Sequence, residues 1–279
     1  MFLILIITLS WFFSYLLGEQ TIFLIGVFFS IVISFSSYWF SDKLILSMAR
    51  AKLIEKKDNP ELYRIVENLC ITAGLPLPKI YILNEAQPNA FATGRDSKHA
   101  VIAVTKGLLD KLERNELEGV IAHELAHIGN KDMLLGSVIV VLAGIVALVS
   151  RQFLRISSWG GRSRDDRKSR PAFLFVFGIL AAILAPIVAT LIRLAISRKR
   201  EFLADATGAL LTRYPEGLAS ALEKISNDSS VLRVANTSTS HLYISNPFKG
   251  KESKSWFTKL FMTHPPAEER IKALRGMEI

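Results

Sequence analysis

Residues 120–132 read VIAHELAHIGNKD and place two histidines, His123 and His127, four positions apart with Glu124 beside the first. On an α-helix, residues four apart lie on one face about one turn from each other, so both imidazoles can reach a single metal ion. Glu124 is rotated by about 100° from His123 and can reach a water molecule on that ion without binding the ion itself. The stretch therefore predicts a helix that carries a hydrolytic metal site.

The alternative is a half-exposed helix whose polar side chains at 123, 124 and 127 are only hydrogen-bonded. For a lone histidine we would favour that interpretation, but a five-residue HELAH motif in a strongly helical window favours the metal site. Cys70 is the only cysteine of the chain, which excludes a thiolate-rich site and an intramolecular disulfide. Tetrahedral zinc with one open position therefore needs a third ligand, a carboxylate on another helix.

Downstream carboxylates supply the candidates for this third ligand: Asp165, Asp166, Glu201, Asp205, Glu216 and Glu223. His127 lies on the order of 10 Å of helix before one long apolar run and Glu201 on the order of 14 Å after another, so both would arrive at a similar height above a bilayer. Within EFLAD, Glu201 and Asp205 share a helix face. This favours Glu201 as the ligand and Asp205 as the carboxylate that orients a ligating histidine. A surface helix with Lys and Arg pairs is the alternative.

Long apolar runs dominate the rest of the chain, which has 279 residues, 50% of them hydrophobic. Four uncharged stretches are each about long enough to cross roughly 30 Å of hydrocarbon. They are residues 1–17, 22–40, 134–150 and 172–192. We therefore predict a mainly α-helical integral membrane protein with an N-terminal transmembrane hairpin at 1–41 and a second hydrophobic hairpin at 134–192.

The charges around the first hairpin predict its orientation. The turn at 18–21 carries no Lys or Arg, whereas five basic residues follow the second run, at positions 43, 50, 52, 56 and 57. The positive-inside rule therefore puts residue 41 onward in the cytoplasm. The basic loop at 151–170 opposes this rule if the second hairpin spans. Either the earlier segments dominate the orientation, or the third and fourth runs enter the membrane without fully crossing it.

Mixed sequence between and after the hairpins predicts a catalytic domain in two parts, residues 42–133 and 193–279. Its expected elements include a helix from Pro60 to Gly74 and short strands at 78–84 and 100–105. Asn115 and Glu118 resemble a capping box that begins the HELAH helix. The pattern predicts an α+β domain with a small β-sheet, joined to the transmembrane helices.

Together these segments resemble the HtpX-type membrane-integrated zinc endopeptidases, which are related more distantly to the CAAX prenyl endopeptidases. The resemblance covers nearly the whole chain and rests on the two hairpins and on NAFATG at 89–94, AHELAHIGNKD at 122–132, EFLAD at 201–205 and THPP at 263–266. It implies a zincin-like (gluzincin) fold with one zinc ion per chain, held by His123, His127 and Glu201. Glu124 would be the general base and acid, in a multi-pass protein of the cell (inner) membrane whose active site faces the cytoplasm.

The same resemblance implies roles for residues outside the zinc helices. His264 matches a position that stabilises the tetrahedral oxyanion. Arg270 matches a position in the polar network around the zinc helices, where Asp205 would be its side-chain partner. Asn89 matches a position near the substrate. Residues 88–93 also fit an edge strand to which an extended substrate could add, so Asn89, Ala90 and Phe91 are the predicted substrate contacts. A turn residue, a surface histidine and a solvated arginine are the corresponding structural interpretations.

These features predict a peptide-bond hydrolase acting on membrane or misfolded proteins, in keeping with the quality-control role under stress that the resemblance implies. A noncatalytic membrane scaffold is one alternative, but its structural metal would need a closed four-ligand site. A CAAX-type processing protease is another, although four apolar runs are few to enclose a large intramembrane chamber. The predicted partners are protein or peptide substrates and the lipid bilayer. Basic residues beside anionic lipid explain the net charge of +9 without nucleic acid, and the oligomeric state stays open.

Overall fold

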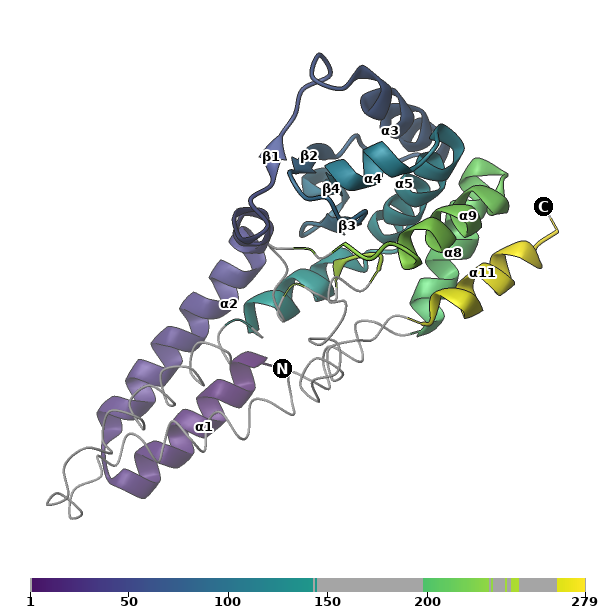
Figure 1. The fold of residues 1–279 in the computed structure, drawn as a ribbon. Helices are drawn as coiled ribbons and strands as arrows, with labels where there is room; N and C mark the ends of the chain where they lie inside the picture. The colour runs from purple at the N-terminus through teal and green to yellow at the C-terminus, as the bar shows by residue number, and fades with distance from the viewer. Residues whose placement is uncertain are drawn as a thin grey trace, which may run out of the picture.

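The computed structural model describes residues 2–142, 144, 198–230, 232, 239, 242–245 and 265–278. A long helical hairpin, α1 (Phe2–Leu17) and α2 (Gln20–Met48), projects away from a domain that contains a small sheet and several helices (Figure 1). Most of the predicted hairpin at 134–192 lies outside the described residues. Its first part is described, as a helix spanning Met133–Leu142.

α2 is long and apolar enough to cross a membrane, with a mean hydropathy of 2.0 over a window of which only 11% is buried. Within the described part of the chain it is the one helix that meets these criteria by itself. α1 has 16 residues, fewer than the roughly 20 that a span needs. Helices Arg114–Gly129 and Met133–Leu142 meet the criteria only as a pair, across a bend of 84°. One candidate membrane helix near the N-terminus is therefore present.

The sheet has four strands in the order β1-β2-β4-β3. They are β1 (Lys52–Leu53), β2 (Lys79–Leu83), β3 (Ala90–Thr93) and β4 (Val101–Thr105). β2 and β4 run parallel, while β1 and β3 each run antiparallel to their neighbour. The predicted small sheet is confirmed, and β3 lies at its edge, with Ala90 opposite Val104 and Thr93 opposite Val101.

The remaining helices lie beside the sheet, with α8, α9 and α11 beyond α5 as seen from β1 (Figure 1). They are α3 (Pro60–Ala73), the short η1 (Ser97–His99), α4 (Lys106–Lys111), α5 (Arg114–Gly129), α8 (Arg198–Thr212), α9 (Pro215–Ser226) and α11 (Ala267–Arg275). Successive strand residues point to opposite faces. Ile102 and Val104 of β4 therefore pack into the core shared with α3, α5 and α9, whereas Val101 and Ala103 pack with Ile45 at the end of α2. The candidate membrane helix is thus packed directly onto the sheet.

α5 begins at Arg114, because a capping box joins the Glu113 and Glu116 side chains to each other's backbone N–H groups. The predicted capping box at Asn115 and Glu118 is therefore wrong by two residues. The carboxylate of Glu116 also accepts hydrogen bonds from Ser220 (2.5 Å) and Lys224 (2.8 Å) of α9. These partners come from a distant segment of the chain. Sequence spacing alone therefore could not show that Glu116, rather than Glu118, forms the capping box.

α5 and α8 approach each other closely where Gly208 meets His123. A Cβ atom at Gly208 would lie 3.0 Å from the backbone nitrogen of His123 and 3.2 Å from its Cα. Both neighbours are backbone atoms of a buried helix, so they cannot rotate out of the way. The missing side chain therefore permits the helix spacing that brings Glu201 and Asp205 of α8 toward α5.

We predict that Gly208→Ala forces α8 away from α5 and lowers the free energy of unfolding by about 1–3 kcal/mol, as overpacked sites do. Zinc affinity should fall with it, because the carboxylates of α8 shift relative to His123. Gly129→Ala is the matched control, since a Cβ there would meet only Leu75, at 3.8 Å. Thermal unfolding and zinc titration of the detergent-purified variants check this. Equal stability of the two variants would show that the spacing is not set by Gly208.

Candidate metal centre

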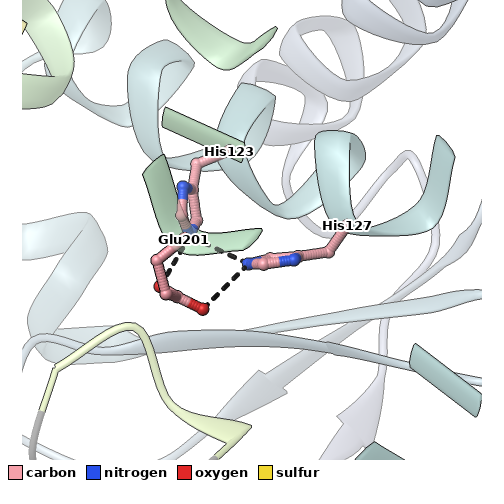
Figure 2. Close-up of side chains that lie close together, drawn as sticks. All are labelled: His123, His127 and Glu201. Carbon is pink, nitrogen blue, oxygen red and sulfur yellow. Dashed lines mark hydrogen bonds and ion pairs between the residues drawn. The ribbon is translucent and has the colours of Figure 1, made fainter. Parts of the chain in front are cut away.

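Three side chains from two helices converge at the junction of α5 and α8. Figure 2 shows His123 and His127 of α5 and Glu201 of α8 pointing toward one another. The two Nε2 atoms lie 3.2 Å apart, and Glu201 places Oε1 3.6 Å from His127 Nε2 and Oε2 3.9 Å from His123 Nε2. The structure therefore brings together the three residues that the sequence predicts as metal ligands.

The spacing of these atoms fits a tetrahedral zinc ion. Zinc binds imidazole nitrogen and carboxylate oxygen at about 2.0–2.2 Å, which corresponds to about 3.3–3.5 Å between neighbouring ligand atoms of a tetrahedron. The 3.2 Å between the two nitrogens and the 3.6 Å from His127 Nε2 to Oε1 of Glu201 lie close to that range, and the second carboxylate oxygen lies 3.9 Å from His123 Nε2. Among the described residues, this group is the one set of His, Cys, Asp or Glu side chains with metal-binding geometry. Three protein ligands leave one position of the tetrahedron for water or substrate.

The buried charges around the three ligands also fit a divalent cation. Glu124, Glu201, Asp205 and Arg270 are each no more than 3% exposed. Buried charges are costly unless they are paired or bind a metal. Three carboxylates against one guanidinium leave two negative charges that neutral imidazoles do not balance. A divalent cation restores neutrality, so the donor set suits a divalent metal in charge as well as in geometry.

His123 is oriented by a buried pair of charged side chains. Its Nδ1 atom lies 2.9 Å from Oδ1 of Asp205, and Arg270 of α11 donates to both oxygens of the same carboxylate, at 2.6 and 2.8 Å. Burial lowers the pKa of His123 to about 4 even though Asp205 favours its charged form. Burial opposes ionisation of Asp205, but Arg270 and His123 outweigh it and hold the pKa of Asp205 at about 2. A neutral His123 that donates from Nδ1 leaves Nε2 available for a metal.

His127 has a carboxylate partner that the sequence motifs do not predict. Its Nδ1 atom lies 3.1 Å from Oδ2 of Asp132, and Arg200 of α8 donates to the other oxygen at 3.1 Å. Burial lowers the pKa of His127, but the hydrogen bond with Asp132 and the charge of Glu201 outweigh it and raise that pKa to about 9. Asp132 directly precedes helix Met133–Leu142, so from sequence it resembles a helix cap. A carboxylate five residues after HExxH was the available signal.

The predicted substrate contacts lie along β3 and are covered by a short segment of the chain, residues 242–245. The amide of Asn89 donates to the carbonyl of Ser245 (3.0 Å) and accepts from its N–H (3.3 Å). The N–H of Ile244 donates to the carbonyl of Ala90 at 3.0 Å, and Arg270 donates to the carbonyl of Ile244 at 3.3 Å.

Phe91 has a different environment from Asn89. Its ring packs edge-on against the ring of Tyr243, with 5.2 Å between the ring centroids, in the core shared with α2. Residues 242–245 therefore connect the edge of the sheet to the polar network of the metal centre, a link that no sequence pattern had indicated. The remaining predicted site residue, His264, lies outside the described residues.

A helix with an HExxH motif and a glutamate from a second helix is an arrangement typical of metallopeptidases. Residues 56–278 match the model of peptidase family M48, and the chain belongs to this family. Proteins described as protease HtpX homologs are similar to the chain over most of its length. That of Pyrococcus furiosus is 49% identical, over 94% of this chain and 89% of its own. That of Thermococcus sibiricus is 48% identical, with the same two shares. The HtpX-type resemblance is therefore confirmed.

A solved structure has a fold similar to that of this chain. The crystal structure of S. mikatae Ste24p matches 95% of this chain with a TM-score of 0.53 at 20% sequence identity. The matched region is 64% of the Ste24p chain, so this chain spans less than two thirds of that protein. At this identity the likeness concerns the fold alone.

We predict that zinc affinity rises with pH. Both imidazoles must be unprotonated to bind a metal, so a ligand that holds a proton has to release it. With a pKa of about 9, His127 is protonated at neutral pH in the metal-free protein, whereas His123, with a pKa of about 4, is not. Binding therefore releases one proton, and the affinity should increase about tenfold per pH unit between about pH 6 and about pH 8. Chelator competition across this range measures it, and an affinity independent of pH would contradict the assignment.

Proposed function

We propose that the chain is a membrane-bound zinc endopeptidase with a gluzincin-type catalytic domain, which hydrolyses peptide bonds of membrane or misfolded proteins. The observation that carries the proposal is the convergence of His123, His127 and Glu201 with separations suited to tetrahedral zinc. Membership of family M48 supports a protease. The similarity to HtpX homologs supports a membrane-associated one, and a role in membrane-protein quality control under stress is part of the proposal.

The residues divide the proposed reaction between them. His123, His127 and Glu201 would hold a zinc ion, which would lower the pKa of a bound water to near 7 and polarise the scissile carbonyl. Glu124 takes the proton of the attacking water and passes it to the leaving amine. Glu124 is 2% exposed, and its negative charge raises the pKa of both His127 and Arg270, which supports this role. His264 is proposed to steady the tetrahedral oxyanion.

The edge of β3 is the proposed binding site for an extended substrate. Asn89 pairs with Thr105 of β4, so in the antiparallel ladder Ala90 and Ala92 direct their backbone groups away from β4. Ile244 already donates to Ala90, and the proposal is that an added strand would bind to the backbone groups of Ala92. Binding through backbone hydrogen bonds would read shape more than sequence, as suits a protease of unfolded segments. Asn89 would shape one end of this edge through its bonds to Ser245.

We propose a multi-pass protein of the cell (inner) membrane with the active site on the cytoplasmic side. Its organisation would be an N-terminal hairpin at 1–41, a second hairpin at 134–192, and a catalytic domain formed by 42–133 and 193–279. The apolar surface of α2 and the basic residues that follow position 41 support this orientation. The packing of the end of α2 onto the sheet would keep the metal centre close to the membrane.

The two alternative functions have less support. A structural metal in a noncatalytic scaffold would need four protein ligands, and the described residues supply a group of three. CAAX-type processing rests on the more distant resemblance to the CAAX prenyl endopeptidases, and no contact among the described residues favours a lipidated substrate. A purely structural metal gives no reason for the acidic side chain that directly follows the first metal-binding histidine.

We predict that Glu124→Gln abolishes cleavage of an unfolded protein such as casein while zinc stays bound at about one ion per chain. The amide keeps the shape of the side chain but cannot accept the proton, so the rate should fall by about 10²–10⁴-fold. Glu118→Gln is the matched control, because Glu118 lies on the same helix in a surface pair with Arg114. Wild-type rates for Glu124→Gln would disprove the role, and the absence of zinc from the wild type would disprove the site.

A further inference from the structure

Each histidine of the metal centre is held by an aspartate, and each aspartate by an arginine. The first set is His123, Asp205 and Arg270, with separations of 2.9 Å between histidine and aspartate and 2.6 Å between aspartate and arginine. We call it the inner relay. The second set, the outer relay, is His127, Asp132 and Arg200, with both separations at 3.1 Å. The inner relay matches the roles expected of Asp205 and Arg270, whereas the outer relay has no assigned role.

The backbone places Asp132 at the Nδ1 side of His127. Lys131 adopts a left-handed conformation with φ of 61°, and the N–H of Asp132 donates to the carbonyl of His127 at 3.0 Å. The chain bends here by 84° between α5 and helix Met133–Leu142. The bend therefore returns the carboxylate to a histidine five residues earlier, where a continued helix would carry it past.

The outer relay also connects the two helices that supply the metal ligands. Arg200 directly precedes Glu201 on α8, and it reaches across to Asp132, three residues beyond the end of α5. α8 thus contributes one ligand itself and, through Arg200 and Asp132, holds a ligand of the other helix. The side chains of His127, Asp132 and Arg200 are 17%, 14% and 39% exposed, in contrast to 1–2% in the inner relay.

We propose that Asp132 and Arg200 are positioning residues for His127. Asp132 accepts a hydrogen bond from the Nδ1–H group of His127, which directs Nε2 toward the metal. Arg200 holds the Asp132 carboxylate in the orientation that this hydrogen bond requires. Mutation of a carboxylate that orients a ligating histidine in this way typically lowers metal affinity or activity by about 10–100-fold. The proposal rests on the zinc site of the proposed function and adds two residues to it.

A purely structural role makes different predictions. If Asp132 only began helix Met133–Leu142, or only formed a surface ion pair, its loss would change stability and leave zinc affinity unchanged. If it orients His127, the loss should appear in zinc affinity as well as in any change of metal-free stability. An asparagine, which still offers an oxygen to the Nδ1–H group, should then retain more affinity than an alanine.

The test is zinc affinity of the full chain in detergent, measured by competition with a chromogenic chelator, together with thermal unfolding of the metal-free protein. We expect Asp132→Ala to bind zinc about 10–100-fold more weakly and Asp132→Asn to lose less. Arg200→Gln should weaken binding in the wild-type background but not in Asp132→Ala, because the arginine acts through the aspartate. Asp110→Asn and Arg198→Gln are matched controls, at an exposed aspartate of α4 and at an exposed arginine of α8 whose partner is Glu269.

Wild-type zinc affinity in Asp132→Ala, or equal losses in the alanine and asparagine variants, would overturn the role of Asp132. Additive losses from Asp132→Ala and Arg200→Gln would overturn the relay. If Asp132→Ala does not fold, Asp132→Asn and Arg200→Gln decide, since wild-type affinity in both would reject the proposal. A wild type that neither binds zinc nor cleaves protein would instead disprove the proposed function, whereas a wild type that does both, with unaffected variants, would remove only this inference.

Discussion

The buried charge at the junction of α5 and α8 is the constraint on which the rest of the structure depends. Glu124, Glu201 and Asp205 bring three carboxylates into an interior where Arg270 is the buried cation. Such an arrangement is stable only when further positive charge is present, because an uncompensated buried charge typically costs several kcal/mol. A proton on His127 supplies part of that charge in the metal-free protein, and a divalent metal would supply all of it. Charge balance thus links folding of the domain to metal binding.

Packing contacts elsewhere in the domain position the charged groups at the junction of α5 and α8. Gly208 lets α8 approach the backbone of His123, and α11 delivers Arg270 from the far end of the chain. Residues 242–245 then connect Arg270 with the edge of β3, so the metal centre and the proposed substrate edge share one hydrogen-bonded network. On the other face of the sheet, α2 packs against β4. The sheet is therefore the element through which the candidate membrane helix is connected to the site.

The sequence predicts those parts of the molecule whose signals are local. Helix α3 begins at Pro60 and ends before Gly74, as proline and glycine indicate, and the two central strands lie where their apolar residues predict them. The HELAH spacing likewise brings two histidines together on one face of α5. Glu201 was selected from six carboxylates only with the help of membrane topology and of the family pattern.

The features that sequence missed depend on contacts between distant segments. The beginning of α5 was misplaced because Glu116 is selected by partners on α9, 104 and 108 positions away. Asp132 resembles a helix cap until the bend after α5 turns it toward His127, and nothing in its neighbourhood points to Arg200. The placement of Ile244 on Ala90 is equally non-local, since a backbone hydrogen bond leaves no trace in side-chain pattern.

The most direct test of the account is anomalous diffraction at the zinc absorption edge from crystals of the full chain grown with zinc. The account predicts one strong peak per chain, within about 2.0–2.2 Å of His123 Nε2, His127 Nε2 and a carboxylate oxygen of Glu201, with the fourth position held by a non-protein ligand. A peak coordinated by four protein side chains would indicate a structural metal. The absence of a peak between α5 and α8 would contradict the metal centre itself.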